Sequence, residues 1–120
     1  MPSVLALGLD PAFVSLPDSP GLTPDLIRTF IETQLDRLRS LGYVVEECLV
    51  DSGETAEAVT LSALRVRSFD CVMFGAGLRA PEHLLLFEKL MNAVHTEAPH
   101  ARICFNTTPA DTAEAVQRWV

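Results

Sequence analysis

The fold of this chain is decided by the stretch at residues 69–81, which reads Phe69-Asp70-Cys71-Val72-Met73-Phe74-Gly75-Ala76-Gly77-Leu78-Arg79-Ala80-Pro81. Its residues 71–74 are a short apolar run, a pattern typical of a strand that is covered on both faces. Two glycines, an arginine and a helix-opening proline follow this run. The stretch therefore predicts a buried strand that leaves the sheet through a tight loop of small residues, with the rest of the chain packed around it.

Apolar runs and helical periodicity alternate along the rest of the chain. Further strands are predicted at residues 4–9, 43–50 and 102–106. Helices are predicted at residues 24–41, 54–66 and 82–96, and a last helix begins within residues 107–111. At the start of this last helix, Thr108 and Asp111 have the spacing of a capping box.

Strands that alternate with helices of this length require a parallel sheet with right-handed crossovers. We therefore expect one α/β domain over residues 1–120. Its expected architecture is a three-layer, doubly wound sheet of four parallel strands in the order 2-1-3-4, with helices on both faces.

The composition argues against several classes of partner. The formal net charge is −7, and the nine Lys and Arg residues are scattered rather than clustered. Nucleic acids and anionic membranes are bound by clustered basic residues, so neither partner is expected. The apolar run at residues 4–7 is too short for a signal peptide or a membrane span, and we expect a cytoplasmic protein.

The cysteines and histidines predict no metal centre. Cys48, Cys71 and Cys104 fall in three separate apolar runs without a Cys-x-x-Cys pair, so we interpret them as reduced thiols that fill core space. His95 and His100 lie at and just beyond the far end of the predicted helix that His83 starts, so the three cannot form one metal site, and no zinc-like spacing occurs.

The carboxyl edge of the predicted sheet is the expected binding site. Ligands of an open α/β sheet bind outside the carboxyl ends of the strands, where the strand order reverses. In the predicted order, this point lies between the strands at residues 4–9 and 71–74. The residues expected there to bind a compact anionic ligand are Ser52, Gly75, Gly77, Arg79, Asn106 and Thr107.

The loop after the central strand has two interpretations. Residues 75–80 match Gly-x-Gly-x-x-Ala, but the loop follows the third predicted strand rather than the first, and no acidic residue ends a later strand at the usual spacing. In one interpretation, Gly75 and Gly77 only permit a tight turn between strand and helix. In the other, their backbone N–H groups and Arg79 bind a phosphate or carboxylate.

Asp10 and His83 are the candidate acid and base. Asp10 ends the first predicted strand, where many α/β enzymes have a carboxylate, but an Asp before Pro11 is also an ordinary turn residue. His83 falls within the apolar arc at the start of its helix, where a histidine either transfers protons or packs against a neighbouring loop. The proline-rich connection at residues 11–22 is long enough to be a binding loop.

Some apolar residues lie outside the predicted core. In the helix at residues 54–66, the expected core-facing stripe is Val59, Ala63 and Val66. The leucines that lie off such stripes are Leu61, Leu64 and Leu85. The strand at residues 102–105 is also expected to be an apolar edge strand. Such a surplus of apolar surface favours a homo-oligomer, most simply a two-fold dimer.

The residue pattern of three segments is similar to that of a known group of α/β domains. They are residues 41–45 (Leu-Gly-Tyr-Val-Val), 51–54 (Asp-Ser-Gly-Glu) and 69–73 (Phe-Asp-Cys-Val-Met). With them the chain resembles the flavodoxin-like, or Rossmann-like, small α/β domains, which include receiver and corrinoid-binding domains. Gly75 stands where a receiver has its phosphoacceptor Asp, and residues 10–15 lack the Asp-x-His-x-x-Gly of corrinoid-binding domains. The resemblance therefore implies the architecture and no particular activity.

Two functions are consistent with the sequence. The first is a site for a compact anionic small molecule at the carboxyl edge, with the substrate, reaction and cofactor unassigned. The second is a non-catalytic, homo-oligomeric interaction or regulatory module. The long connection at residues 11–22 favours the first, because a pure assembly surface does not require it.

Overall fold

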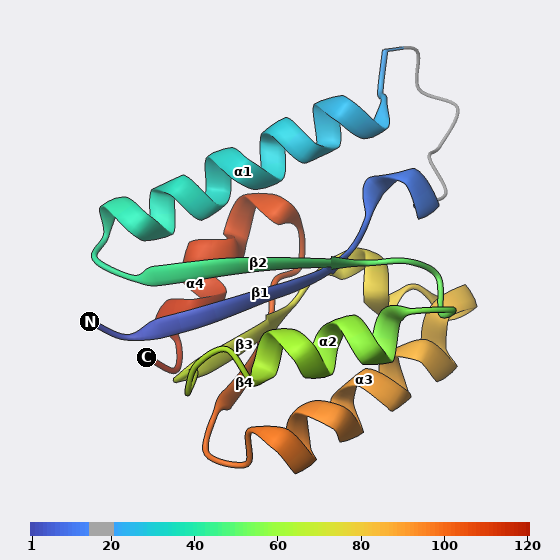
Figure 1. Ribbon diagram of the computed structural model, residues 1–120. Helices are drawn as coiled ribbons and strands as arrows, with labels where there is room; N and C mark the ends of the chain where they lie inside the picture. Colours follow the sequence, from blue (N-terminus) through green and yellow to red (C-terminus); the bar gives the residue numbers. More distant parts are fainter. Residues whose placement is uncertain (15–20) are drawn as a thin grey trace.

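The described part of the chain is built around one parallel sheet. A computed structural model describes residues 1–14 and 21–120 (Figure 1). Its strands are β1 (Ser3–Leu9), β2 (Val44–Val50), β3 (Cys71–Phe74) and β4 (Arg102–Phe105). They lie in the order β2-β1-β3-β4, and each neighbouring pair is parallel. The predicted fold class and strand order are confirmed.

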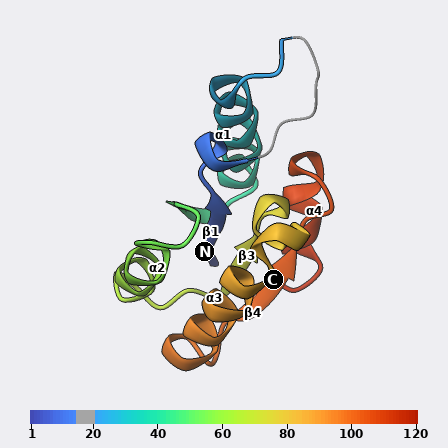
Figure 2. The ribbon, with the colours of Figure 1, turned by 90° about the vertical axis from the view of Figure 1, so that its right-hand side faces the viewer.

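Helices cover both faces of the sheet and complete three layers (Figure 2). One face carries α1 (Pro24–Ser40) and α4 (Thr112–Gln117), and the other carries α2 (Ala56–Leu64) and α3 (Leu84–Glu97). Short 3-10 helices follow three of the strands; they are η1 (Pro11–Phe13), η2 (Ala76–Arg79), η3 (Pro81–His83) and η4 (Pro109–Asp111). No helix in residues 1–14 and 21–120 is both long and apolar enough to span a membrane.

Local sequence signals set the helix boundaries. The Thr23 hydroxyl accepts a hydrogen bond from the Leu26 N–H at 3.2 Å, and Pro24 occupies the first turn of α1. The predicted capping box between Thr108 and Asp111 is present and starts η4, which leads into α4. Of the proline-rich connection predicted at residues 11–22, residues 15–20 lie outside the described part of the chain.

The sheet separates two apolar cores. Alternate residues of each strand point to opposite faces, so β1 gives Leu5 and Leu7 to the core under α2 and α3. The same strand gives Val4 and Ala6 to the core under α1 and α4. All four residues of β3 are buried, as the central apolar run predicted.

Of the predicted core-facing stripe of α2, only Ala63 packs against the core, whereas Val59 and Val66 are exposed. The buried residues of this helix are Ala56, Thr60 and Leu64. Val66 lies beyond the helix and is 62% exposed, whereas Leu64 is only 5% exposed. The error arises because Thr60, a polar residue, occupies the middle of the true stripe and hides its apolar periodicity. Leu64 is therefore a core residue and no part of an association surface.

The position of Leu64 predicts a large loss of stability on truncation. We expect Leu64→Ala to lower the free energy of unfolding by roughly 2–5 kcal/mol, because it removes buried apolar atoms and leaves a void. The matched control is Leu85→Ala in α3, where the side chain is 75% exposed and the change should stay within about 0.5 kcal/mol. Urea unfolding followed by circular dichroism measures both. Equal midpoints for the two variants would contradict the burial of Leu64.

Candidate functional site

Two glycines lie side by side at the carboxyl edge of the sheet. Leu7 of β1 pairs with Phe74 of β3, so the next residues along the two strands, Gly8 and Gly75, are neighbours. A Cβ atom added to Gly75 would lie 3.6 Å from the Gly8 Cα atom. Neither glycine has a positive φ, so the backbone conformation does not require glycine at these positions. Their effect is to leave the middle of the sheet without side chains at this edge.

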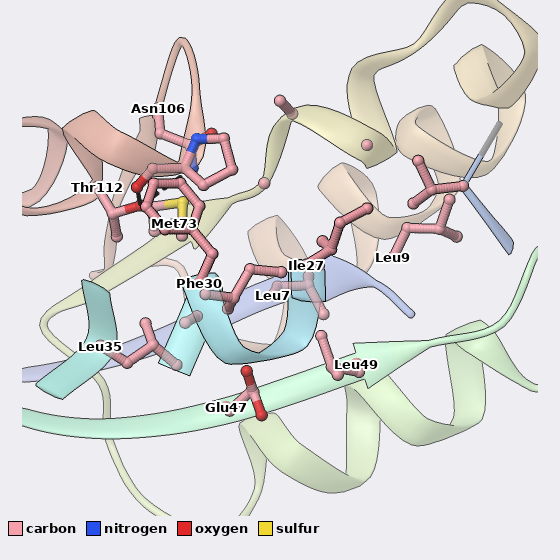
Figure 3. Close-up of a pocket in the computed structure, with 18 of the residues that line it drawn as sticks. Leu7, Leu9, Ile27, Phe30, Leu35, Glu47, Leu49, Met73, Asn106 and Thr112 are labelled. Carbon is pink, nitrogen blue, oxygen red and sulfur yellow. Dashed lines mark hydrogen bonds between the residues drawn. The ribbon is translucent and has the colours of Figure 1, made fainter. Parts of the chain in front are cut away.

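A cavity of about 380 Å³ lies over these glycines, between the sheet and α1 (Figure 3). Its floor consists of small residues, namely Ala6, Gly8, Gly75, Ala76 and Gly77. Its walls are mostly larger apolar side chains, among them Leu22, Ile27, Phe30, Ile31, Leu35, Leu49 and Met73. The volume falls in the range of roughly 300–1,000 Å³ that is typical of small-molecule sites.

Glu47 of β2 is the one ionisable residue among the described residues that line the cavity. Its carboxyl group has a raised pKa, chiefly because part of the side chain is buried. The carboxylates of Glu32 and Asp10 raise this pKa further, and Arg39 opposes them. No ion pair within the described residues involves Glu47. The cavity therefore has on one side a carboxyl group that forms no ion pair within the described residues.

Asn106 lies on the opposite side of the cavity and is already hydrogen-bonded (Figure 3). It is 4% exposed, and its Nδ2 donates to the Thr112 hydroxyl at 3.2 Å. That hydroxyl donates in turn to the Pro109 carbonyl at 2.7 Å. These bonds fix the amide beside the cavity wall.

Arg79 does not line the cavity, although the sequence placed it at the binding site. Its guanidinium donates to the Phe74 carbonyl and to both the carbonyl and the Oδ1 atom of Asn106. It also lies 5.2 Å from the centre of the Phe105 ring, a cation–π distance. Burial lowers the pKa of this guanidinium. The side chain thus joins the carboxyl ends of β3 and β4.

Asp10 also makes internal contacts. Its Oδ1 atom accepts a hydrogen bond from the Ala12 N–H at 2.9 Å and forms an ion pair with Arg28 of α1 at 2.5 Å. The backbone hydrogen bond, followed by the Arg28 interactions, lowers the pKa of Asp10. The carboxylate therefore ties the end of β1 to the helix that covers the cavity, while lying outside the cavity lining itself.

The remaining predicted site residues lie outside the cavity lining. His83 ends η3 and precedes α3, and its N–H donates to the Ala80 carbonyl at 2.9 Å. Ser52 is exposed in the turn after β2. Thr107 is exposed, and both its N–H and its hydroxyl donate to Asp111.

The structure brings Gly75, Gly77 and Asn106 together at one cavity, and sequence reasoning missed Gly8 and Glu47. The sequence contains a signal for each of these two residues. Gly8 stands near the end of the first predicted strand, just as Gly75 follows the third. On β2, Glu47 alternates with the apolar Val45 and Leu49, which puts a carboxylate in the middle of an apolar strand face.

The three cysteines are buried and free, in agreement with their interpretation as core thiols. Cys71 and Cys104 lie on adjacent strands with their Sγ atoms 3.4 Å apart, a contact that the sequence did not reveal. Both belong to the core under α1 and α4.

No protein-family model matches this sequence, and no curated protein is detectably similar to it. The interpretation of the site therefore rests on its geometry and chemistry.

The contacts of Arg79 predict that its removal destabilises the fold. We expect Arg79→Met to lower the free energy of unfolding by about 2–3 kcal/mol, because it leaves buried acceptors at the ends of β3 and β4 without a charged donor. The control is Arg37→Met, which removes an exposed ion pair with Glu114 and should cost at most about 1 kcal/mol. Urea unfolding compares the two. An Arg79→Met variant as stable as the control would contradict the structural role of this guanidinium.

Proposed function

We propose that the chain binds a compact, largely apolar small molecule in the cavity at the carboxyl edge of its sheet. The observation that carries the proposal is the pair of neighbouring glycines, Gly8 and Gly75, which leaves a side-chain-free floor under α1. The cavity lies where the strand order reverses, between β1 and β3, which is the usual ligand position in open α/β sheets.

The lining favours an apolar ligand over the compact anion that the sequence suggested. The Arg79 guanidinium is hydrogen-bonded to backbone and amide oxygens outside the cavity. The one ionisable group of the described lining is an acid, Glu47, and it repels an anion. The apolar walls instead gain free energy by burying an apolar surface of matching size.

The proposal concerns binding and assigns no reaction. Asp10 and His83, the predicted acid and base, are not among the cavity-lining residues. Asp10 is held in an ion pair with Arg28, so its carboxylate is already committed to a structural contact.

Filling the floor of the cavity tests the proposal. A Cβ atom at Gly8 would meet only the Leu49 Cδ2 atom, at an ordinary 3.6 Å, so Gly8→Ala should fold and gain up to about 1 kcal/mol in stability. We expect 2-phenylethanol to shift the amide resonances of Gly8, Gly75 and Gly77 in the wild-type protein. Gly8→Ala should weaken that binding several-fold, as measured by NMR titration and thermal melting.

Two observations serve as controls for this titration. The amide of Gly42, which lies outside the cavity, should not shift. The variant Ala58→Val adds bulk at an exposed position of α2 on the other face of the sheet and should leave binding unchanged. Glycine resonances that stay unchanged at saturating 2-phenylethanol would contradict an apolar site here.

A homo-oligomeric module is the second candidate, and exposed leucines at the start of α3 favour it. Leu84 and Leu85 are 61% and 75% exposed. The sheet edges are less suited to association, because arginines bond to carbonyls there. Arg118 donates to the Phe105 carbonyl of β4 at 2.8 Å, and Arg39 donates to the Val45 carbonyl of β2 at 3.3 Å. An interface would therefore use the helix surface rather than a strand edge.

Sedimentation velocity over a range of concentrations tests this second candidate. If α3 forms the interface, Leu85→Glu should convert a dimer to a monomer, since it places a charge in an apolar contact. Val66→Glu, at an exposed position beyond α2, should leave the dimer intact. A wild-type chain that sediments as a monomer at every concentration would reject the candidate and leave the cavity proposal unaffected.

A further inference from the structure

We infer that the molecule bound in this cavity carries a protonated amine, and that Glu47 is the residue that binds the amine. The inference rests on the proposed function, because it names the ligand class of the same site. It follows from the position of one carboxylate in an otherwise apolar cavity and from the charges around it.

The strand alternation of β2 directs Glu47 to the cavity. Val45, Glu47 and Leu49 share the face of the sheet under α1, where Val45 joins the core and Leu49 lines the cavity. Figure 3 shows Glu47 beside Leu49 at the edge of the cavity, on the side away from Asn106. Glu46 points to the opposite face, where it forms an ion pair with Arg67 at 2.9 Å. The two adjacent glutamates thus differ, one being paired and the other facing the cavity.

Arg39, which acts on Glu47, and Arg28, which pairs with Asp10, are both held by other acids. Arg39 bonds to Glu32 and Asp36, each at 2.8 Å. Arg28 bonds to Asp10 at 2.5 Å and Asp25 at 2.9 Å. Within the described residues, no basic side chain forms an ion pair with Glu47 itself.

The charge balance near the cavity favours a cation. Burial holds the pKa of Glu47 above its usual value, the carboxylates of Glu32 and Asp10 raise it further, and Arg39 acts in the opposite direction. A ligand ammonium at Glu47 would be attracted to this carboxylate and to its acidic neighbours, whereas a ligand carboxylate would be repelled by all of them. Phe30, whose side chain lines the same cavity from α1, adds an aromatic surface that also attracts cations.

Three probes of similar size separate the possible ligand classes. They are 2-phenylethylamine, 2-phenylethanol and phenylacetate, which present a cation, a neutral hydroxyl and an anion on the same ring. At neutral pH and low salt we expect the amine to bind about two- to fivefold more tightly than the alcohol, which corresponds to one exposed ion pair. Phenylacetate should bind most weakly. NMR titration of the glycine amides gives all three dissociation constants.

Two glutamate variants assign the effect to one side chain. Glu47→Gln should reduce the affinity for the amine to that for the alcohol and leave the alcohol unchanged. Glu46→Gln makes the same chemical change on the opposite face and should alter neither. In the wild-type protein, the affinity for the amine should also fall as the pH decreases through the raised pKa of Glu47, because the protonated carboxyl group no longer attracts the ammonium.

The outcomes distinguish this inference from the proposed function. If the amine and the alcohol bind equally and Glu47→Gln changes neither, the amine inference is overturned while the apolar site stands. If phenylacetate binds most tightly, the inference is overturned in favour of the anion that the sequence suggested. If none of the probes shifts the glycine resonances, both the inference and the proposed function are overturned.

Discussion

Strand β3 is hydrogen-bonded on both sides and covered on both faces, and the rest of the structure depends on this position. Its residues alternate between the two cores, with Val72 and Phe74 on one side and Cys71 and Met73 on the other. A strand buried in this way tolerates only apolar side chains along its length. Polar and unusual residues can therefore appear only where the strand ends, and the candidate site lies at its carboxyl end.

Arg79 provides hydrogen bonds to the backbone carbonyl groups at that end. Where β3 and β4 stop, the carbonyl groups of Phe74 and Asn106 have no further strand to bond to, and unpaired buried carbonyls are costly. One guanidinium donates to both carbonyls and to the Asn106 amide, and it lies against the Phe105 ring. Because its donors are used in this way, Arg79 does not determine what the cavity binds. Glu47, on the far side, is left as the charged group of the described lining.

The sequence predicted the strands, their order and the helix caps because these depend on local patterns and on the handedness of crossovers. It did not predict which distant residues the arginines contact. Arg79 reaches Asn106, and Arg28 reaches Asp10, over separations of 27 and 18 residues. Such contacts depend on tertiary geometry that periodicity does not encode. The stripe of α2 was misplaced for a related reason, since a buried threonine does not register as a core residue in an apolar pattern.

The glycines of this chain fall into two physical kinds, and the difference bears on function. Gly42 and Gly53 have φ values of 101° and 145°, which other residues rarely adopt, so the backbone alone explains them. Gly8 and Gly75 have no positive φ, and a Cβ atom at either would make only ordinary contacts. An alanine at either position would bury more apolar surface and would reduce the conformational entropy of the unfolded chain, so glycine costs stability at both positions. Protein interiors are otherwise filled to high density. An apolar space that the sheet keeps open at this cost, with a carboxylate at its edge, is better explained by a ligand that occupies it than by the requirements of folding.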